Sequence, residues 1–268
     1  MRIDTARYDM NGALRDNTFI AYDNNDQRVG VGAVVEYINE ALLPDRPLNY
    51  FLTIDGFARA RDILFGAVYA RARVMRRLKP ELAGRIYASC SPRDPERLMF
   101  FADMGFDTQD AEYVMRYTLS RDVRPIRPPV GTTLSVSNVR NIEDTDRMLA
   151  RVNKYSITAH SRGWLEDMMN SPLFAALAVK DDDKYVGEAI ITGYGNEGSI
   201  VSIYTVPQVR RHGVALALLS AAHEMFMSQG LAFSTAKVWS RFIPATYLFE
   251  KAGYKKAAQS MLYPGVNV

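Results

Sequence analysis

The chain has 268 residues, of which 48% are hydrophobic and 24% are charged, and its formal net charge is +3. These totals are ordinary for a soluble globular protein, and so small a charge does not by itself indicate a nucleic-acid partner. Cys90 is the single cysteine, so an internal disulfide is excluded and a reducing cytoplasm is the expected setting.

No segment approaches the roughly 20 apolar residues that span a bilayer, and residues 1–17 lack the apolar run of a signal peptide. We therefore expect a cytoplasmic protein that does not bind membranes. His160, His212 and His223 lie far apart, and none has a Cys or His at ligand spacing, so we expect no metal site.

The first half of the chain predicts strands, a long helix, a further strand and a short helix. Apolar runs bounded by polar turns indicate the strands, and apolar residues at helical spacing indicate the helices. The expected strands cover 18–23, 28–38, 48–54 and 84–90, and the expected helices lie within 60–78 and 94–106.

A break follows from Ser120 to Thr133, where three prolines and a glycine occur with almost no apolar periodicity. This composition is typical of a linker. We expect a first domain at 1–120, a linker at 121–131 and a second domain at 132–268.

The second half predicts a mixed α/β fold in which strands and helices alternate. Asp181 to Asp183 form a polar turn between two strands, and Gly230 ends the longest helix. The expected strands cover 132–139, 174–180, 185–194, 198–206, 231–239 and 259–263, and the expected helices lie within 142–157, 164–169, 214–229 and 244–252.

The two halves repeat one another. FFADMGF from Phe100 is similar to LFEKAGY from Leu248, and the strands before them, 84–90 and 233–239, lie at much the same offset. The order of elements in the first half also repeats the later part of the second. We predict a tandem duplication in which the first copy has lost most of its opening strand and helices.

The stretch VPQVRRHGVALALL, from Val206 to Leu219, joins an apolar strand to an apolar helix through two arginines, a histidine and a glycine. The first amides of a helix lack partners and carry the positive end of its dipole, so they bind phosphate oxygens. Gly213 lets a ligand approach the backbone. The stretch therefore predicts a pyrophosphate site, although it matches neither a Walker loop nor a G-x-G-x-x-G turn.

Two motifs in the second half are similar to one enzyme family. Arg210 to Ala215 (RRHGVA) resembles R/Q-x-x-G-x-G/A, the coenzyme A pyrophosphate loop of the GNAT N-acetyltransferases. Residues 238–254 (VWSRFIPATYLFEKAGY) resemble the family's V-x-x-x-N-x-x-A-x-x-L-Y-x-K-x-G-F. The resemblance covers the second half and, more weakly, most of the first. It implies two tandem acyl-CoA N-acyltransferase (GNAT) folds, the first of them degenerate.

The resemblance also implies acetyl-CoA as the cofactor and direct attack of a primary amine on its thioester. In the family two central strands splay apart and the pantetheine arm lies between them, which here means along Ile203 to Val206. A backbone amide near Tyr204 or Thr205 is expected to stabilise the oxyanion. The residues expected to contact the cofactor are Ile203, Tyr204, Thr205, Val206, Arg210, Arg211, His212, Gly213, Val214, Ala215 and Phe249.

The expected catalytic groups depart from the family pattern. Phe249 stands where the family has its tyrosine acid, and Phe242 stands where it has an asparagine. Since phenylalanine cannot donate a proton, Tyr204 or Ser240 is the alternative acid, unless the thiolate leaves without one. Glu188 is the candidate base.

The first copy departs further. Its loop position reads Arg59 to Leu64, with Asp62 where Gly213 stands in the second copy. An aspartate brings negative charge and a Cβ to the place of the pyrophosphate. We therefore expect this copy not to bind coenzyme A, and to brace the other copy or shape the acceptor cleft.

These observations predict an N-acetyltransferase that acts on a primary amine of a small molecule or a peptide, as a monomer or homodimer without a nucleic-acid partner. The competing interpretation, favoured by Phe242 and Phe249, is a non-catalytic acyl-CoA-binding or scaffold protein. A third is a peptide or ribosomal-protein N-acetyltransferase. His160, between the first two helices of the second half, lies where the family forms its acceptor cleft.

Overall fold

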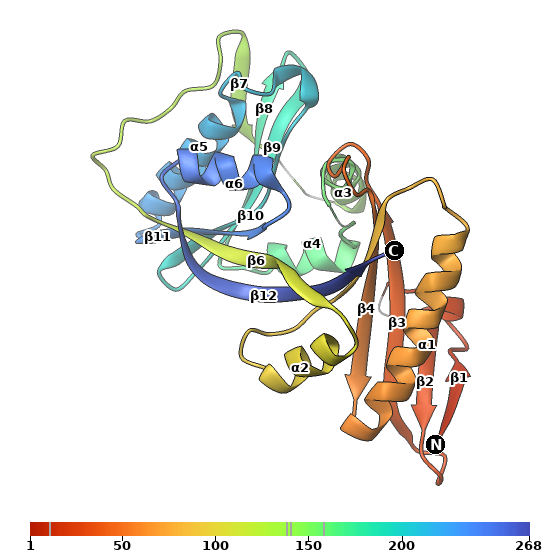
Figure 1. The fold of residues 1–268 in the computed structure, drawn as a ribbon. Coiled ribbons are helices and arrows are strands. Elements are labelled where there is room, and N and C mark those ends of the chain that lie inside the picture. The colour runs from red at the N-terminus through yellow and green to blue at the C-terminus, as the bar shows by residue number, and fades with distance from the viewer. Residues whose placement is uncertain (11, 138, 140, 158) are drawn as a thin grey trace. The chain divides into compact units, whose positions relative to one another are not determined.

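The computed structural model describes residues 1–10, 12–137, 139, 141–157 and 159–268. They form two compact units, shown in Figure 1. Unit 1 comprises Met1–Ala111 and Ser260–Val268, and unit 2 comprises Glu112–Gln259. Each unit is a mixed α/β structure built on its own run of paired strands, as the sequence predicts.

The sheet of unit 1 has the strand order β1-β2-β3-β4-β5-β12. Its neighbours are antiparallel except β4 and β5, which are parallel. The strands are β1 (Arg2–Thr5), β2 (Thr18–Tyr22), β3 (Arg28–Ile38), β4 (Leu48–Gly56), β5 (Gly84–Ala88) and the end of β12 (Lys255–Asn267).

One core packs the helices of unit 1 on this sheet. The helices are α1 (Ala58–Arg77) and α2 (Pro95–Asp103). Leu64 and Val68 of α1 are fully buried in a cluster with Leu52 of β4 and Phe101 of α2. Gly32 of β3 permits the close approach of α1, because a Cβ there would lie 2.9 Å from Val68 Cγ1.

The sheet of unit 2 has the strand order β6-β11-β10-β9-β8-β7. Here β10 and β11 are parallel and the other neighbours are antiparallel. The strands are β6 (Asp107–Thr118), β7 (Thr132–Val136), β8 (Leu173–Asp181), β9 (Lys184–Tyr194), β10 (Glu197–Thr205) and β11 (Phe233–Trp239).

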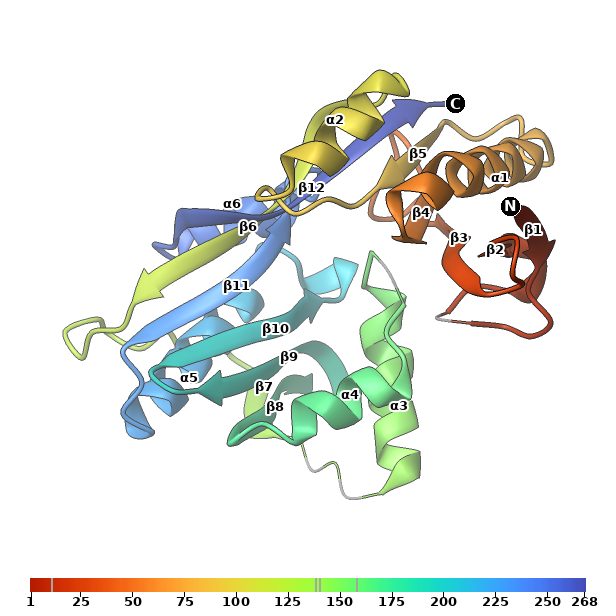
Figure 2. The same ribbon diagram turned by 90° about the horizontal axis from the view of Figure 1, so that it is seen from below.

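Helices cover both faces of the unit 2 sheet, as Figure 2 shows. The helices α3 (Ile142–Lys154) and α4 (Arg162–Met169) bury Met148 and Leu165 against one face. The helices α5 (Val214–Ser228) and α6 (Ile243–Lys251) bury Leu218 and Phe249 on the other. We refer to these as the α3/α4 face and the α5/α6 face.

The last strand of each copy pairs with a strand of the other copy. β6 follows α2, yet its residues 112–118 pair with β11 in unit 2. The end of β12 follows α6, yet Gly265–Asn267 pair with β5 in unit 1. The compact units therefore differ from the expected division along the chain at 112–120 and 260–268.

The expected linker holds no helix or strand, since residues 119–131 form neither. It does not separate the compact units, however, because it lies within unit 2. The amide of Ile126 donates to Ser220 Oγ of α5 at 2.8 Å, which holds the segment on that helix. The linker is thus a strap on unit 2.

The repeated element order is present: β2-β3-β4-α1-β5-α2-β6 in the first copy matches β8-β9-β10-α5-β11-α6-β12 in the second. The prediction that the first copy lacks most of its opening strand is wrong. β1 pairs antiparallel with β2, as β7 pairs with β8. Only the two helices have no counterpart among the described residues, where a 3₁₀ turn (Arg15–Asn17) precedes β2.

Candidate acyl-CoA site

The two parallel strands at the centre of unit 2 separate halfway along their length. Glu197–Ile200 of β10 pair with Phe233–Ala236 of β11. Beyond that point, among the described residues, β10 pairs only with β9 and β11 only with β6. An irregularity in the β9 pairing between Ile200 and Ser202 marks where β10 turns away.

Backbone groups of β10 face the space that this separation opens. The Val206 amide donates to the Val186 carbonyl of β9 at 3.0 Å. Because bonded and non-bonded residues alternate in an antiparallel pair, the amides and carbonyls of Ile203 and Thr205 point away from β9, toward β11. Of the two expected oxyanion donors, Thr205 is therefore turned to the opening, and Tyr204 bonds toward β9.

The loop after β10 presents a row of amides without backbone partners. A 3₁₀ turn (Pro207–Val209) and a four-residue turn lead into α5. Within the described chain, the amides of Gly213, Val214, Ala215 and Leu216 donate to no backbone acceptor. They are the first N–H groups of a 15-residue helix, at the positive end of its dipole.

Two residues with left-handed backbone conformation curve the loop. Arg211 has φ +67° and Gly213 has φ +90°. Such alternation turns successive amides to one side, which forms a concavity for anions. A Cβ at Gly213 would find no described heavy atom within 4 Å, so the space beside it is open.

Two arginines and a histidine belong to this turn. Arg210, Arg211 and His212 are exposed, and none forms an ion pair with a described residue. Cations are disfavoured at a helix N-terminus unless an anion binds there. The amides, the open backbone beside Gly213 and the charge of Arg210 and Arg211 fit an anion such as pyrophosphate.

Glu188 and Tyr204, expected as separate catalytic candidates, are bonded to each other. They are cross-strand neighbours on β9 and β10. The Tyr204 hydroxyl donates to Glu188, and Arg151 of α3 donates to both Glu188 oxygens at 2.7 and 2.8 Å. Burial, followed by the nearby Glu188 carboxylate, raises the pKa of Tyr204.

This arrangement constrains what the trio can do. Glu188 is 2% exposed and both of its carboxylate oxygens accept hydrogen bonds from Arg151, so the group is covered and already has partners. Tyr204 keeps its proton and directs it to Glu188. The sequence analysis missed Arg151, because nothing local signals that a helix residue will pair with a strand 37 residues later.

Phe249 and Ser240 lie apart from this trio. Phe249 is 3% exposed in the core of the α5/α6 face, with its ring edge-on to Tyr254 at 5.0 Å. Ser240 follows β11, so it lies across the strand separation from Tyr204. Tyr247, two residues before Phe249, is 64% exposed, so it lies on another face of α6.

The expected acceptor region is packed with aromatic rings. Tyr155 stacks on Tyr204 with centroids 4.6 Å apart, and His160 stacks on Trp164 at 3.9 Å. The Asn153 side chain bonds both the amide and the carbonyl of His160, which fixes the loop between α3 and α4. Burial lowers the pKa of His160.

In the first copy the corresponding loop is missing. Arg59 to Leu64 were expected at a loop position, but they lie in the first two turns of α1. Only Phe57 separates β4 from α1. Asp62 therefore replaces no loop glycine: it is a helical residue, and the left-handed turn that curves the loop of unit 2 has no counterpart here.

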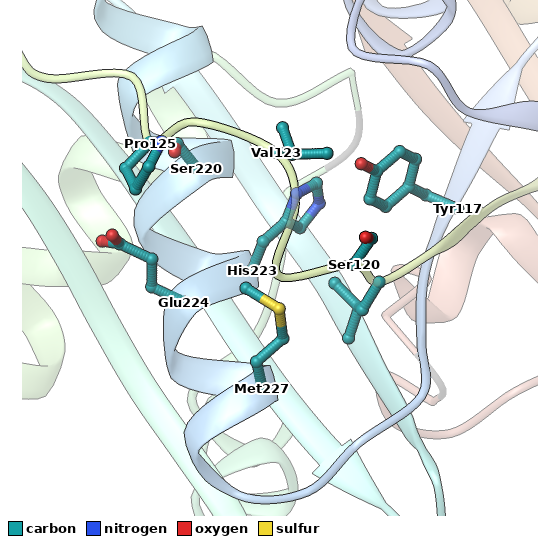
Figure 3. Close-up of a pocket in the computed structure, with 9 residues that line it drawn as sticks. Tyr117, Ser120, Val123, Pro125, Ser220, His223, Glu224 and Met227 are labelled. Atoms are coloured by element: carbon teal, nitrogen blue, oxygen red, sulfur yellow. The ribbon is translucent and has the colours of Figure 1, made fainter.

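A second polar cluster of unit 2 lies under the strap, beside α5. Figure 3 shows His223 projecting toward the segment that carries Ser120 and Val123. His223 Nε2 bonds Tyr254 Oη at 2.8 Å, and Tyr254 Oη bonds Ser234 Oγ at 2.5 Å. The cavity here is about 30 Å³, enough for a water molecule. Burial lowers the pKa of His223 to about 4.

The described residues show neither a metal-binding cluster nor a membrane-spanning helix. They contain no group of three or more His, Cys, Asp or Glu side chains that could hold a metal ion. Of the helices they form, none is both long and apolar enough to span a bilayer.

Known proteins with a similar sequence motif or fold include acetyltransferases of one family. Residues 139–254 match the model of the acetyltransferase (GNAT) family. A GCN5-related N-acetyltransferase from Sphaerobacter thermophilus is similar in structure with a TM-score of 0.53 and 16% identity, over 94% of this chain and 80% of that one. A tandem GNAT protein from the clavulanic acid biosynthesis pathway has a TM-score of 0.51 and 14% identity, over 93% and 82%. A search of the curated proteins found no match.

Proposed function

We propose that this chain, which belongs to the acetyltransferase (GNAT) family through residues 139–254, transfers an acetyl group from acetyl-CoA to a primary amine. The observation that carries the proposal is the loop at Arg210–Ala215, with its unpartnered amides, beside the separated strands β10 and β11. The buried, single Cys90 agrees with the cytoplasm as the place of this activity.

Different residues of unit 2 bind the pyrophosphate and the pantetheine arm. The amides of Gly213 to Leu216, with Arg210 and Arg211, hold the pyrophosphate. The backbone groups of Ile203 and Thr205 bond the pantetheine arm and orient the acyl carbonyl toward the opening. Bound acetyl-CoA supplies an activated thioester.

The proton steps need few side chains. With acetyl-CoA bound, the Thr205 amide would be available to stabilise negative charge on the carbonyl oxygen, a contribution that is usually the largest in acyl transfer. Glu188 is bonded to Arg151 and Tyr204, so we propose that the ammonium loses one proton to bulk solvent before attack. The C–N bond would form as the C–S bond breaks, the second proton of the nitrogen would pass to solvent, and the thiolate would leave without an acid, which is compatible with Phe249 in the place of the family's tyrosine.

The second candidate is a scaffold that binds acyl-CoA without turning it over. Phe249 lies in the core, and Phe242 caps the N-terminus of α6 without a side-chain hydrogen bond. Neither donates a proton. The loop alone does not distinguish the two candidates, because both need it.

Release of free thiol from acetyl-CoA separates them. The wild-type protein is incubated with acetyl-CoA and a panel of small primary amines and peptides with free N-termini, and the thiol is measured with a reactive dye. Cys90 does not compete, since it is buried and burial raises the pKa of its thiol to about 11. Release that depends on one class of amine supports the transferase. Cofactor binding without release for any amine would support the scaffold.

A further inference from the structure

The outer edge of β7 is unpaired. Among the described residues, β7 is the last strand of the unit 2 sheet and pairs with β8 alone. The Ser137 amide donates to the Ala176 carbonyl of β8 at 2.7 Å. By the alternation of antiparallel strands, the amides and carbonyls of Leu134 and Val136 point away from β8, toward a possible further strand.

β7 lacks the residue types that commonly prevent an edge strand from pairing with another strand. Its sequence, TTLSV, contains no charged residue and no proline. The edge strand of unit 1 differs: β1 reads RIDT, and its Arg2 forms ion pairs with Asp4 and Asp26. Charged side chains are a common protection of edge strands. One edge of this protein is thus protected and the other is not.

An apolar groove adjoins the unprotected edge. Leu134 is 38% exposed and Val136 is 55% exposed. They lie opposite Val179 and Leu177 in the β8 pairing, which places them on the α5/α6 face. The groove between them and α5 has a volume of about 430 Å³. No residue of the strap lines it; the lining residues are Leu134, Ser135, Val136, Leu177, Ala221, Glu224, Met225 and Ser228.

We infer that β7 pairs antiparallel with β7 of a second copy of this chain, across a two-fold axis at Leu134. In this register the two Leu134 residues exchange their backbone hydrogen bonds, and each Val136 amide reaches the Thr132 carbonyl of the other copy. Thr133 faces Ser135. Side chains directly opposite in an antiparallel pair lie on the same face, so Leu134 meets Leu134 and Val136 meets the β-branched Thr132 over the grooves, and the hydroxyl side chains meet on the other side.

The second copy is the occupant that this edge fits, because the strand is complementary to itself. It carries no charge, so no like charges face each other across the axis. An isologous contact of this kind closes a dimer and leaves no β7 edge unpaired. The inference stands independently of the proposed acyl transfer.

Sedimentation velocity over a range of concentrations tests the dimer. The wild type is expected to sediment as a dimer that dissociates on dilution. Leu134→Lys places two ammonium groups at the axis and is expected to raise the dimer Kd about tenfold or more. Thr5→Lys, an exposed position on the protected edge strand β1, is the matched control and is expected to leave the Kd unchanged.

Val136→Lys serves as a second variant, and thermal unfolding shows that each variant is folded. Loss of the dimer in the two β7 variants but not in Thr5→Lys supports the inference. A wild type that stays monomeric at every concentration overturns it. So does a dimer that persists in both β7 variants, or one that is lost equally in Thr5→Lys.

Discussion

At the scale of single residues, unit 2 buries two polar groups with different partners. Glu188 accepts hydrogen bonds from Arg151 at both of its oxygens. His223 is held as a neutral ring, because burial lowers its pKa while its Nε2 bonds the Tyr254 hydroxyl and its ring stacks on Tyr117 at 4.7 Å. On the α5/α6 face, burial therefore opposes protonation of His223.

The neutral His223 predicts a pH dependence of stability. Its pKa falls from 6.5 to about 4 on folding, so the unfolded chain binds this proton first as the pH falls. The wild type is expected to lose up to about 3 kcal/mol of unfolding free energy from this residue as the pH falls from 6.5 to about 4. His223→Gln keeps a partner for Tyr254 but does not titrate, so this part of the loss is absent.

Urea unfolding at several pH values across this window measures the difference. We expect the free energy of unfolding of His223→Gln, relative to that of the wild type, to rise steadily as the pH falls. A constant difference in unfolding free energy between pH 6.5 and about 4 would mean that His223 keeps its ordinary pKa in the folded protein.

Candidate site residues could be predicted from the sequence where a local backbone feature marks them. Contacts between distant side chains could not. The loop at Arg210–Ala215 could be proposed as an anion site, since a glycine after two arginines at a strand-to-helix junction needs no distant partner to be recognised. Glu188 and Tyr204 were predicted as candidates, but their mutual bond and Arg151 were not. Helix periodicity tells which side of α3 is buried, and it does not tell which strand residue an arginine on that side will meet.

At the scale of elements, the two copies differ most in how a strand becomes a helix. In unit 2, β10 is followed by a 3₁₀ turn and a left-handed turn before α5 begins at Val214. In unit 1, α1 begins at Ala58, directly after Phe57, and its first turn is continuous with the helix. The second copy thus has a loop with positive φ angles between the strand and the helix, and the first copy joins the strand to the helix almost directly.

The end of β12 is predicted to hold β5 in place. Gly265 pairs with Tyr87, and a Cβ at Gly265 would lie 2.6 Å from Arg85 Nε and 2.8 Å from the Ile86 carbonyl oxygen. Gly265→Ala is therefore expected to push β12 away from β5 and to destabilise unit 1 by about 1–3 kcal/mol.

Gly66→Ala is the matched control in the same unit. Gly66 is an exposed residue inside α1, with room for a Cβ, so alanine is expected to stabilise the helix by about 0.5–1 kcal/mol. Hydrogen exchange of the β5 amides reports both changes. Unchanged protection of β5 in Gly265→Ala would contradict the role given to β12.

At the scale of the whole molecule, the chain is a duplication whose copies share strands. β6 completes unit 2 beside β11, and the end of β12 completes unit 1 beside β5. The order of strands and helices was predictable from apolar patterns, because those patterns are local. The exchange was not, because a strand such as β6 has the same pattern whichever sheet it joins. For the same reason the expected boundary at 120 differs from that of the compact units.

Calorimetric titration of acetyl-CoA into the wild type and into Gly213→Asp tests the central claim most directly. Gly195→Asp is the matched control: Gly195 and Gly213 have φ of +60° and +90°, and a Cβ at either would find no described heavy atom within 4 Å. The account predicts one site per chain, unchanged in Gly195→Asp and weakened at least about tenfold in Gly213→Asp, where a carboxylate faces the pyrophosphate. A wild type that does not bind acetyl-CoA, or a Gly213→Asp variant that binds it as tightly as the wild type, would contradict the account.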